Sequence, residues 1–291
     1  FLVNVPIGLA LIPLCLRYVP ADGPRHAQPG RHLDVPGIGL LGAGLLAAMI
    51  GLAYLGDTPS GWMASCIAAL VVSVLALGAF AWHTEHAADP LIPPRLIRGR
   101  GFGAVNLICV VYSGFGAGLV ALIPLYATNR YGFGPFDSGT LLAAQAVGAV
   151  ILSTVDAFAL RRTGYRLPLY SAAVLVAIGM LVLAFAPVHI PTYVWLALGA
   201  ALVGVGIGWS SPASRNAGLQ LVPDQAASIA VLRSTAIQIG SITAISITTA
   251  IIAHAADPGT AQAWVYGAYA GLLLLVGLPA SSRILEHKGA W

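Results

Sequence analysis

One long apolar segment, residues 225–253, carries polar side chains at a spacing that could bind a ligand from water. Four of them fall on one face of a helix, at intervals of three, four or seven residues: Ser234, Gln238, Ser241 and Thr248. Hydroxyl and amide groups on such a face can exchange hydrogen bonds with a bound compound, whereas lipid offers them none. The face should therefore meet protein or a water-filled cavity, which favours the passage of a solute.

The composition places most of the chain in lipid. Hydrophobic residues make up 58% of the 291 residues and charged residues only 8%, against about 25% in a soluble domain. The net charge of +4 comes from basic residues in short loops between apolar runs, so no patch for nucleic acid is predicted. The three cysteines lie singly within or beside apolar runs, and we expect neither a disulfide, a metal site nor a cofactor.

Nine segments are apolar over roughly the 20 residues that a membrane helix needs. They are 1–19, 36–55, 62–82, 103–127, 138–160, 167–187, 192–213, 225–253 and 262–282. This pattern predicts an all-α polytopic membrane protein with about nine transmembrane helices. The chain starts inside an apolar run without Met, which we interpret as the loss of upstream helices.

The loops differ strongly in basic residues. Twelve of the 14 Lys and Arg residues fall in the loops after the odd-numbered segments, Arg130 falls in an opposite loop, and Arg233 lies within a helix. Because cytoplasmic loops are enriched in Lys and Arg, the basic side should be cytoplasmic. We therefore expect a multi-pass protein of the plasma membrane, with its C-terminus in the cytoplasm.

Several motifs resemble one transporter family. Residues 1–8 read Phe-x-x-Asn-x-Pro-x-Gly, which is similar to the signature that opens the sixth helix of fourteen-span drug:proton antiporters of the major facilitator superfamily. The resemblance continues at Pro124-Leu125-Tyr126, in the glycine run of residues 204–208, and at residues 234–240, which end in Gln-Ile-Gly. It covers essentially the whole chain.

The resemblance implies a domain organisation. Residues 1–35 would be the last helix of the N-terminal half and a cytoplasmic loop, residues 36–86 two linker helices, and residues 87–291 the six-helix C-terminal half. Segments 103–127, 138–160, 192–213 and 225–253 would line the central cavity, while the other two helices of that half would face lipid. The linker segments contain scarcely any polar residue, so we place them at the periphery.

Two positions depart from the family pattern. The loop motif Gly-x-x-x-Asp-Arg-x-Gly-x-Arg corresponds to residues 157–166, where Arg162, Gly164 and Arg166 match but Arg161 replaces the acidic residue. Thr128 stands where a Gln commonly follows the Pro-Leu-Tyr run.

The candidate ligand contacts lie on the segments that the resemblance assigns to the cavity. They are Asn106, Tyr112, Gln145, Ser234, Gln238 and Ser241. The amide and phenol groups among them could equally form hydrogen bonds between helices, which are common and contribute about 0.6–2 kcal/mol each. Because they lie on the cavity segments, we slightly favour ligand contact.

Two charged residues fall within predicted spans. We favour Asp156 as an interfacial anion paired with Arg161 and Arg162 across a turn, with a protonation or gating carboxylate as the alternative. Arg233 lies about 12 Å along its helix at the usual rise. It is either an interfacial arginine or a gate cation that meets Asp156 or an anionic ligand.

The sequence predicts part of a secondary active transporter that exports small amphipathic compounds or drugs in exchange for protons. Its partners would be the substrate, H⁺, membrane lipids and a missing N-terminal half that rocks against this one. It contains no nucleotide-binding loop. The alternatives are a polytopic intramembrane enzyme, which would need nucleophile, base or metal ligands converging within the membrane, and a nonfunctional or regulatory transporter fragment.

Overall fold

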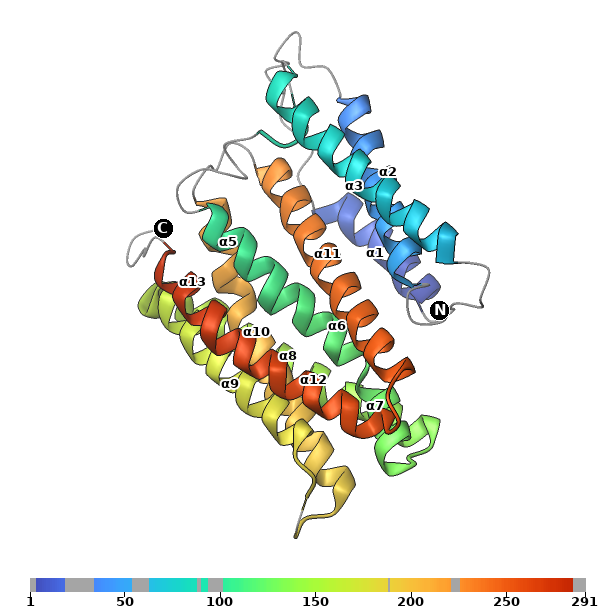
Figure 1. The fold of residues 1–291 in the computed structure, drawn as a ribbon. Coiled ribbons are helices and arrows are strands. Elements are labelled where there is room, and N and C mark those ends of the chain that lie inside the picture. Colours follow the sequence, from blue (N-terminus) through green and yellow to red (C-terminus); the bar gives the residue numbers. More distant parts are fainter. Residues whose placement is uncertain are drawn as a thin grey trace. The chain divides into compact units, whose positions relative to one another are not determined.

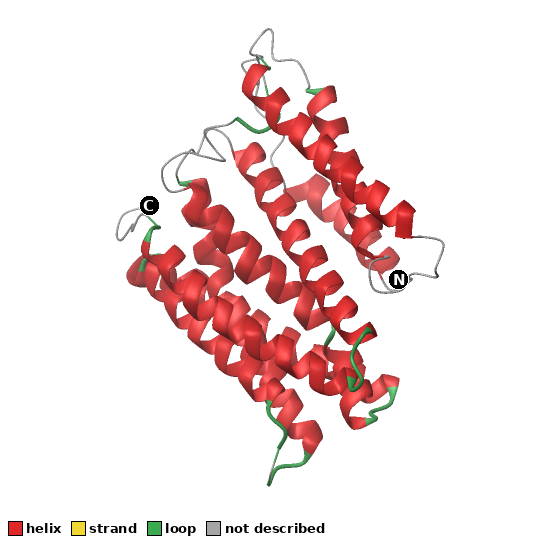
Figure 2. Ribbon diagram, viewed as in Figure 1, coloured by secondary structure: helices red, strands yellow, loops and turns green. Residues whose placement is uncertain are grey.

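The computed structural model describes residues 4–18, 34–53, 63–87, 90–93, 102–187, 189–220 and 226–284, and every regular element in these ranges is helical (Figures 1 and 2). The first helices are α1 (Asn4–Tyr18), α2 (Val35–Ala53) and α3 (Met63–His86). The next run comprises α5 (Phe102–Ile108), η1 (Cys109–Phe115), α6 (Gly116–Ala121) and α7 (Ile123–Tyr131). It is followed by α8 (Pro135–Thr163), α9 (Arg166–Ala184), α10 (Thr192–Leu219), α11 (Ala226–Ala253), α12 (Pro258–Leu272), η3 (Leu273–Gly277) and α13 (Leu278–Ser282). The predicted all-α fold is confirmed.

Eight helical stretches within the described residues are long and apolar enough to cross a membrane. They are Val35–Leu52, Ala64–His86, Phe102–Ala121, Pro135–Leu160, Arg166–Ala184, Thr192–Gln220, Ser228–Ala253 and Pro258–Ser282. Each corresponds to a predicted segment. The ninth prediction, 1–19, corresponds to α1, an apolar helix of 15 residues with Pro13 inside it. The chain divides into two compact units, residues 1–33 with α1 and residues 34–291 with the other helices.

Alternating glycines bring α10 against two neighbours at once. A Cβ added at Gly204 or Gly208 would overlap the backbone carbonyls of Gln145 or Ala149 on α8. A Cβ at Gly206 would instead overlap the Val176 side chain on α9. Small residues allow such close approach where the hydrophobic effect does not drive helices together. The glycine run of residues 204–208 thus allows α10 to pack closely on both α8 and α9.

The predicted segment 103–127 is not one regular helix. It contains the π-helical turn η1 and breaks at Leu122, whose φ and ψ are −93° and 0°. Gly114 and Gly118, in the first part of this run, lie against Gly240 and Ser241 of α11, where an added Cβ would overlap backbone atoms. The break at Leu122 has a signal in the sequence, Pro124, which lacks the N–H that a regular helix needs.

Polar side chains of α12 satisfy carbonyl groups of this irregular run. The Tyr269 hydroxyl donates to the carbonyl of Val111 at 2.7 Å, and Gln262 Nε2 donates to the carbonyl of Leu122 at 2.9 Å. In lipid an unsatisfied carbonyl is costly, so a partner helix supplies the donor. One face of α12 is therefore buried against the bundle, while Trp264 on the same helix is 77% exposed.

Arg130, the exception to the loop asymmetry, has a structural role. It lies at the end of α7 and donates from Nη1 to the carbonyl of Ala184, the last residue of α9, at 3.2 Å. The same nitrogen donates to the Tyr126 hydroxyl at 2.8 Å, and that hydroxyl donates to the carbonyl of Leu183 at 2.6 Å. A cation that bonds the last carbonyls of a helix complements its dipole.

Helices α2 and α3 form a hairpin that packs on the bundle. A cluster of buried side chains joins α2 and α3 to α5 and α11: Leu41, Phe80, Ile92, Phe102 and Ile229. Most other large side chains of α2 and α3 are exposed, including Val74 and Leu75. The hairpin thus contacts the bundle on one side, and its other surface is apolar, as lipid contact requires.

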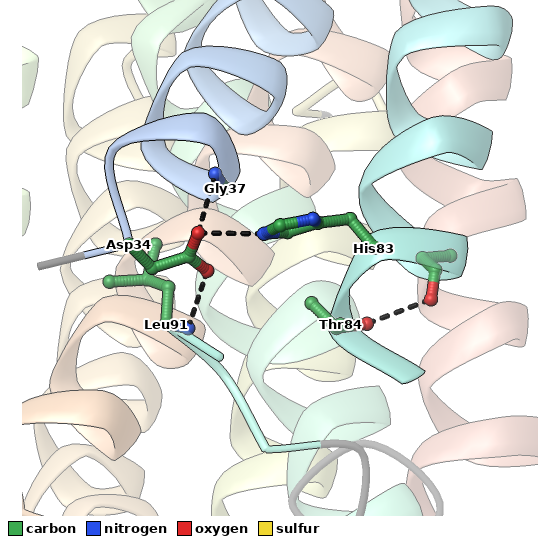
Figure 3. A network of polar contacts seen from close by, with 6 residues as sticks. Asp34, Gly37, His83, Thr84 and Leu91 are labelled. Carbon is green, nitrogen blue, oxygen red and sulfur yellow. Dashed lines mark hydrogen bonds and ion pairs between the residues drawn. The ribbon is translucent and has the colours of Figure 1, made fainter. Parts of the chain in front are cut away.

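A single carboxylate holds the end of this hairpin together (Figure 3). Asp34 precedes α2 and accepts a hydrogen bond from the backbone N–H of Gly37 at 2.8 Å, as an N-cap does. It also accepts from the backbone N–H of Leu91 at 2.8 Å and lies 2.7 Å from Nε2 of His83 on α3. Burial raises the pKa of Asp34, but the hydrogen bonds with Leu91, His83 and Gly37 outweigh burial and hold the pKa below its ordinary value.

Candidate functional site

The polar face of α11 is open along only part of its length. The side chains of Ser234 and Gln238 are exposed, and Ser241 is half-buried. Thr248 is buried and donates to the carbonyl of Ala244 in its own helix at 2.6 Å. The four residues share a face in sequence, but Thr248 lines a different pocket, of about 310 Å³, together with Leu119 of α6 and Tyr269 of α12.

A pocket of about 390 Å³ lies between α10 and α11, at the end of α11 where the polar face is open. Its walls carry two guanidinium groups, one hydroxyl and four aliphatic side chains. The lining residues are Arg215, Leu219, Ile229, Ala230, Arg233, Ser234 and Ile237. Such a mixture of apolar walls with a few polar groups is typical of ligand sites.

Arg233 connects three helices at the edge of this pocket. Its Nη1 donates to Ser214 Oγ on α10 at 3.0 Å and contacts Cys109 Sγ on η1 at 3.4 Å. The residue is half-buried, and the positive charge of Arg215 acts on it across the pocket. Within the part of the chain that the structure describes, Arg233 forms no ion pair with Asp156 or any other carboxylate.

Of the pairing that we predict for Asp156, the described residues do not form the part with Arg162. Asp156 is completely buried on α8, and neither carboxylate oxygen has a hydrogen-bond partner among the described residues. The backbone of Ala213 on α10 approaches it without the geometry of a formed hydrogen bond. Arg162 is exposed and does not pair with it, and the side chain of Arg161 lies outside the described residues. Close packing of α8 on α10 buries this carboxylate inside the bundle.

The remaining candidates lie away from the pocket between α10 and α11. Asn106 is half-buried on α5. Tyr112 is buried in η1, where its hydroxyl donates to the carbonyl of Leu169 at 3.1 Å and lies 3.5 Å from Ser281 Oγ, so it connects helices. Gln145 is half-buried on α8, with its backbone beneath Gly204.

Sequence reasoning missed two members of the site. Arg215 and Ser214 were assigned to a loop after a segment ending at residue 213, but α10 continues to Leu219. Pro212 and its polar neighbours suggest a helix end, yet a membrane helix tolerates proline when neighbouring groups satisfy the freed carbonyl. The spacing of Ser210 and Ser214, four residues apart, is the signal that could have extended the helix.

These features define a class of protein: a polytopic membrane protein whose apolar helices enclose polar and charged groups. Among the described residues no three His, Cys, Asp or Glu side chains are grouped so as to hold a metal ion. Residues 1–245 match the family model of the Major Facilitator Superfamily. The chain belongs to this superfamily, as its sequence motifs predict.

Curated relatives carry names that refer to drug resistance. The chain is 29% identical over 292 residues to MdtD of Serratia proteamaculans, which is named for multidrug resistance. It is 30% identical over 300 residues to the puromycin resistance protein of Streptomyces alboniger, and 28% identical over 258 residues to a multidrug resistance protein B homolog of Mycobacterium tuberculosis. These matches cover 96%, 99% and 87% of this chain but only 59%, 58% and 46% of the relatives. The chain therefore spans about half to three fifths of the length of these proteins.

Proposed function

We propose that this chain is part of a secondary active transporter that exports small amphipathic compounds in exchange for protons. The observation that carries the proposal is the exposed face of Ser234 and Gln238 on a helix long and apolar enough to cross a membrane. Such groups need water or a ligand, and here they adjoin a pocket with aliphatic walls. The drug-resistance names of the relatives support amphipathic compounds as the substrate class.

The proposed transporter has fourteen spans, and this chain would supply the sixth helix, the two linker helices and the C-terminal six-helix half. An N-terminal half would rock against it to expose the polar face of α11 alternately to each side of the membrane. The basic loops would face the cytoplasm and the C-terminus would lie there, in the plasma membrane. Lipids would contact the apolar outer faces of α2, α3, α9 and α12.

Asp156 is our candidate for a protonation site in this half. A charged carboxylate within a bilayer costs about 2.5–3.5 kcal/mol on insertion scales unless it has a partner. Asp156 is buried without one in the described residues. Binding and release of a proton would change its interaction with α10, which also carries Arg215 of the pocket and Ser214, the hydrogen-bond partner of Arg233. A proton carrier of this kind is a means of linking an ion gradient to helix movement.

An intramembrane enzyme is the competing proposal. Catalysis would require a nucleophile, a base or metal ligands that converge at one place. In the described ranges Asp156 stands without a histidine or cysteine beside it, and Cys109 contacts Arg233 instead of a base. We therefore propose transport and not catalysis.

Flux measurements test the proposal. The complete protein would be reconstituted in vesicles with an imposed pH gradient and offered puromycin, the compound in one relative's name. We expect uphill movement of the compound that stops when a protonophore collapses the gradient. Absence of gradient-driven flux for puromycin and for a panel of amphipathic cations would contradict the proposal, and turnover of a lipid-linked substrate would favour the enzyme.

A further inference from the structure

The pocket between α10 and α11 has a chemistry that differs from that of the polar face beside it. From this chemistry we infer that the pocket binds the phosphate group of an anionic membrane phospholipid through Arg215 and Arg233. The inference goes beyond the proposed transport function, because the lipid would be a resident ligand and not the exported compound.

The positive charge of the two arginines is not compensated by a carboxylate in the described part of the chain. An arginine offers five N–H donors and never loses its charge in proteins. Arg233 uses Nη1 on Ser214 and Cys109, both uncharged, and no carboxylate pairs with it or with Arg215 within the described ranges. Two guanidinium groups that face one pocket repel each other, and a phosphate between them would remove that repulsion and accept charge-assisted hydrogen bonds.

Apart from the two arginines and Ser234, the walls of the pocket are apolar. Leu219, Ile229, Ala230 and Ile237 surround the two arginines. A fully hydrated anion such as inorganic phosphate gains nothing from these side chains. A phosphodiester with attached glycerol and acyl groups would place its charge on the arginines and its carbon atoms on the walls.

The two arginines lie near the ends of their apolar helices. Arg233 lies five residues inside the apolar stretch that begins at Ser228, which corresponds to about 7.5 Å at the helical rise. Arg215 lies near the end of α10. This level is where headgroup phosphates meet hydrocarbon, and basic pockets between membrane helices on the cytoplasmic side recognise acidic headgroups.

Native mass spectrometry of the complete protein in neutral detergent tests the inference. Dioleoyl phosphatidylglycerol would be compared with dioleoyl phosphatidylcholine, which has the same acyl chains without net charge. We expect the first lipid to remain bound at concentrations where the second does not. Equal retention of both lipids would overturn the inference, as would full displacement of the anionic lipid by an equal concentration of inorganic phosphate.

Variants assign the binding to the pocket. Arg215→Gln and Arg233→Gln should each weaken phosphatidylglycerol binding about tenfold, the loss expected for one charge-assisted hydrogen bond. Ala230→Phe fills the pocket without changing charge and should also abolish the preference, which covers the case that Arg233→Gln fails to fold. Arg283→Gln is the matched control, because Arg283 is exposed at the end of α13 and does not line the pocket. Equal weakening by Arg283→Gln would mean nonspecific attraction and would contradict the assignment.

A further variant tests whether a carboxylate of the chain itself neutralises the two arginines. Asp224 lies between the two arginines in sequence and outside the described residues. If the arginines are available to lipid, Asp224→Asn leaves phosphatidylglycerol binding unchanged. If Asp224 already neutralises them, the same substitution strengthens binding about tenfold by removing a competing partner, and the lipid would not be the resident ligand. Lipid binding is measured without substrate or gradient, so its failure is distinguishable from failure of transport.

Discussion

Asp156 and Arg233 lie against adjacent residues of α10, Ala213 and Ser214, and do not pair with each other. Consecutive residues of a helix point about 100° apart, so the carboxylate on α8 and the guanidinium on α11 approach α10 from different sides. Pro212 directly precedes this position, where it removes one backbone donor from the helix. A shift of α10 would therefore change the surroundings of both charged groups together.

The first prediction concerns the buried carboxylate. Asp156→Asn should preserve folding, because asparagine has the same shape as the protonated acid and carries no charge. If Asp156 binds the coupling proton, the variant should retain substrate binding and lose transport driven by a pH gradient. The measurements are the melting temperature in detergent, equilibrium binding and gradient-driven flux. Unimpaired proton-driven flux in Asp156→Asn would show that Asp156 has a structural role only.

The second prediction concerns the open end of the polar face. Gln238→Leu should alter the preference among substrates while leaving membrane insertion intact, because the amide is exposed and bonds no neighbouring helix. Loss of one ligand hydrogen bond costs about 0.5–1.5 kcal/mol, or roughly two- to tenfold in apparent affinity. Thr248→Val is the control, since Thr248 bonds its own helix. A lowered melting temperature with unchanged selectivity would assign Gln238 to helix packing.

Some features of the structure could be predicted from the sequence and others could not, depending on whether the feature is set by local composition or by packing between helices. The apolar stretches predicted the helices, since membrane insertion depends on composition that a sequence displays directly. Whether Tyr112 and Asp156 face a cavity or a neighbouring helix depends on which helix packs against each residue. Glycines on other segments, such as Gly208, decide that packing. Arg215 is not predicted as part of the site, because the predicted helix ends at residue 213. A proline inside a membrane helix gives the same sequence signal as a helix end.

The third prediction concerns the glycine contacts that position α10. Gly204→Val should destabilise the protein by about 1–3 kcal/mol or more, because its side chain would overlap the backbone of Gln145. Gly139→Val on α8 is the matched control, since nothing lies within 4 Å of a Cβ added there. Thermal unfolding in detergent measures both. Equal destabilisation by the two variants would mean that helix propensity and not packing limits these positions.

The fourth prediction concerns orientation. The loop asymmetry predicts that Arg98, which lies outside the described residues, is cytoplasmic and that Asn129 near the end of α7 is extracytoplasmic. A membrane-impermeant thiol reagent applied to intact cells should label Asn129→Cys and leave Arg98→Cys unlabelled until the membrane is opened. Both variants need a background without Cys15, which is exposed. Labelling of Arg98→Cys from outside would reverse the assigned orientation.

The last prediction concerns the carboxylate at the linker hairpin. Because the pKa of Asp34 in the folded protein lies below its ordinary value of 3.8, ionised Asp34 stabilises the fold. This stabilisation is complete above pH of about 4 and is lost as the pH falls through the folded pKa. Asp34→Asn should remove that acid dependence and cost about 1–3 kcal/mol at neutral pH, since charge-assisted bonds to Leu91 and His83 are lost.

Two measurements distinguish destabilisation of the α2–α3 hairpin from destabilisation of the whole protein. Cys66 is buried on α3, so its labelling by a membrane-permeant thiol reagent at neutral pH reports opening of the hairpin, and Asp34→Asn should accelerate it. Asp257→Asn is the matched control: Asp257 is also an N-cap, on α12, and hydrogen bonds from Thr260 hold its pKa below the ordinary value, but it is exposed. It should leave Cys66 labelling unchanged. Slow labelling of Cys66 in Asp34→Asn, together with a melting temperature of the unsubstituted protein that does not change between pH 3 and pH 7, would show that the α2–α3 contacts hold the hairpin without this carboxylate.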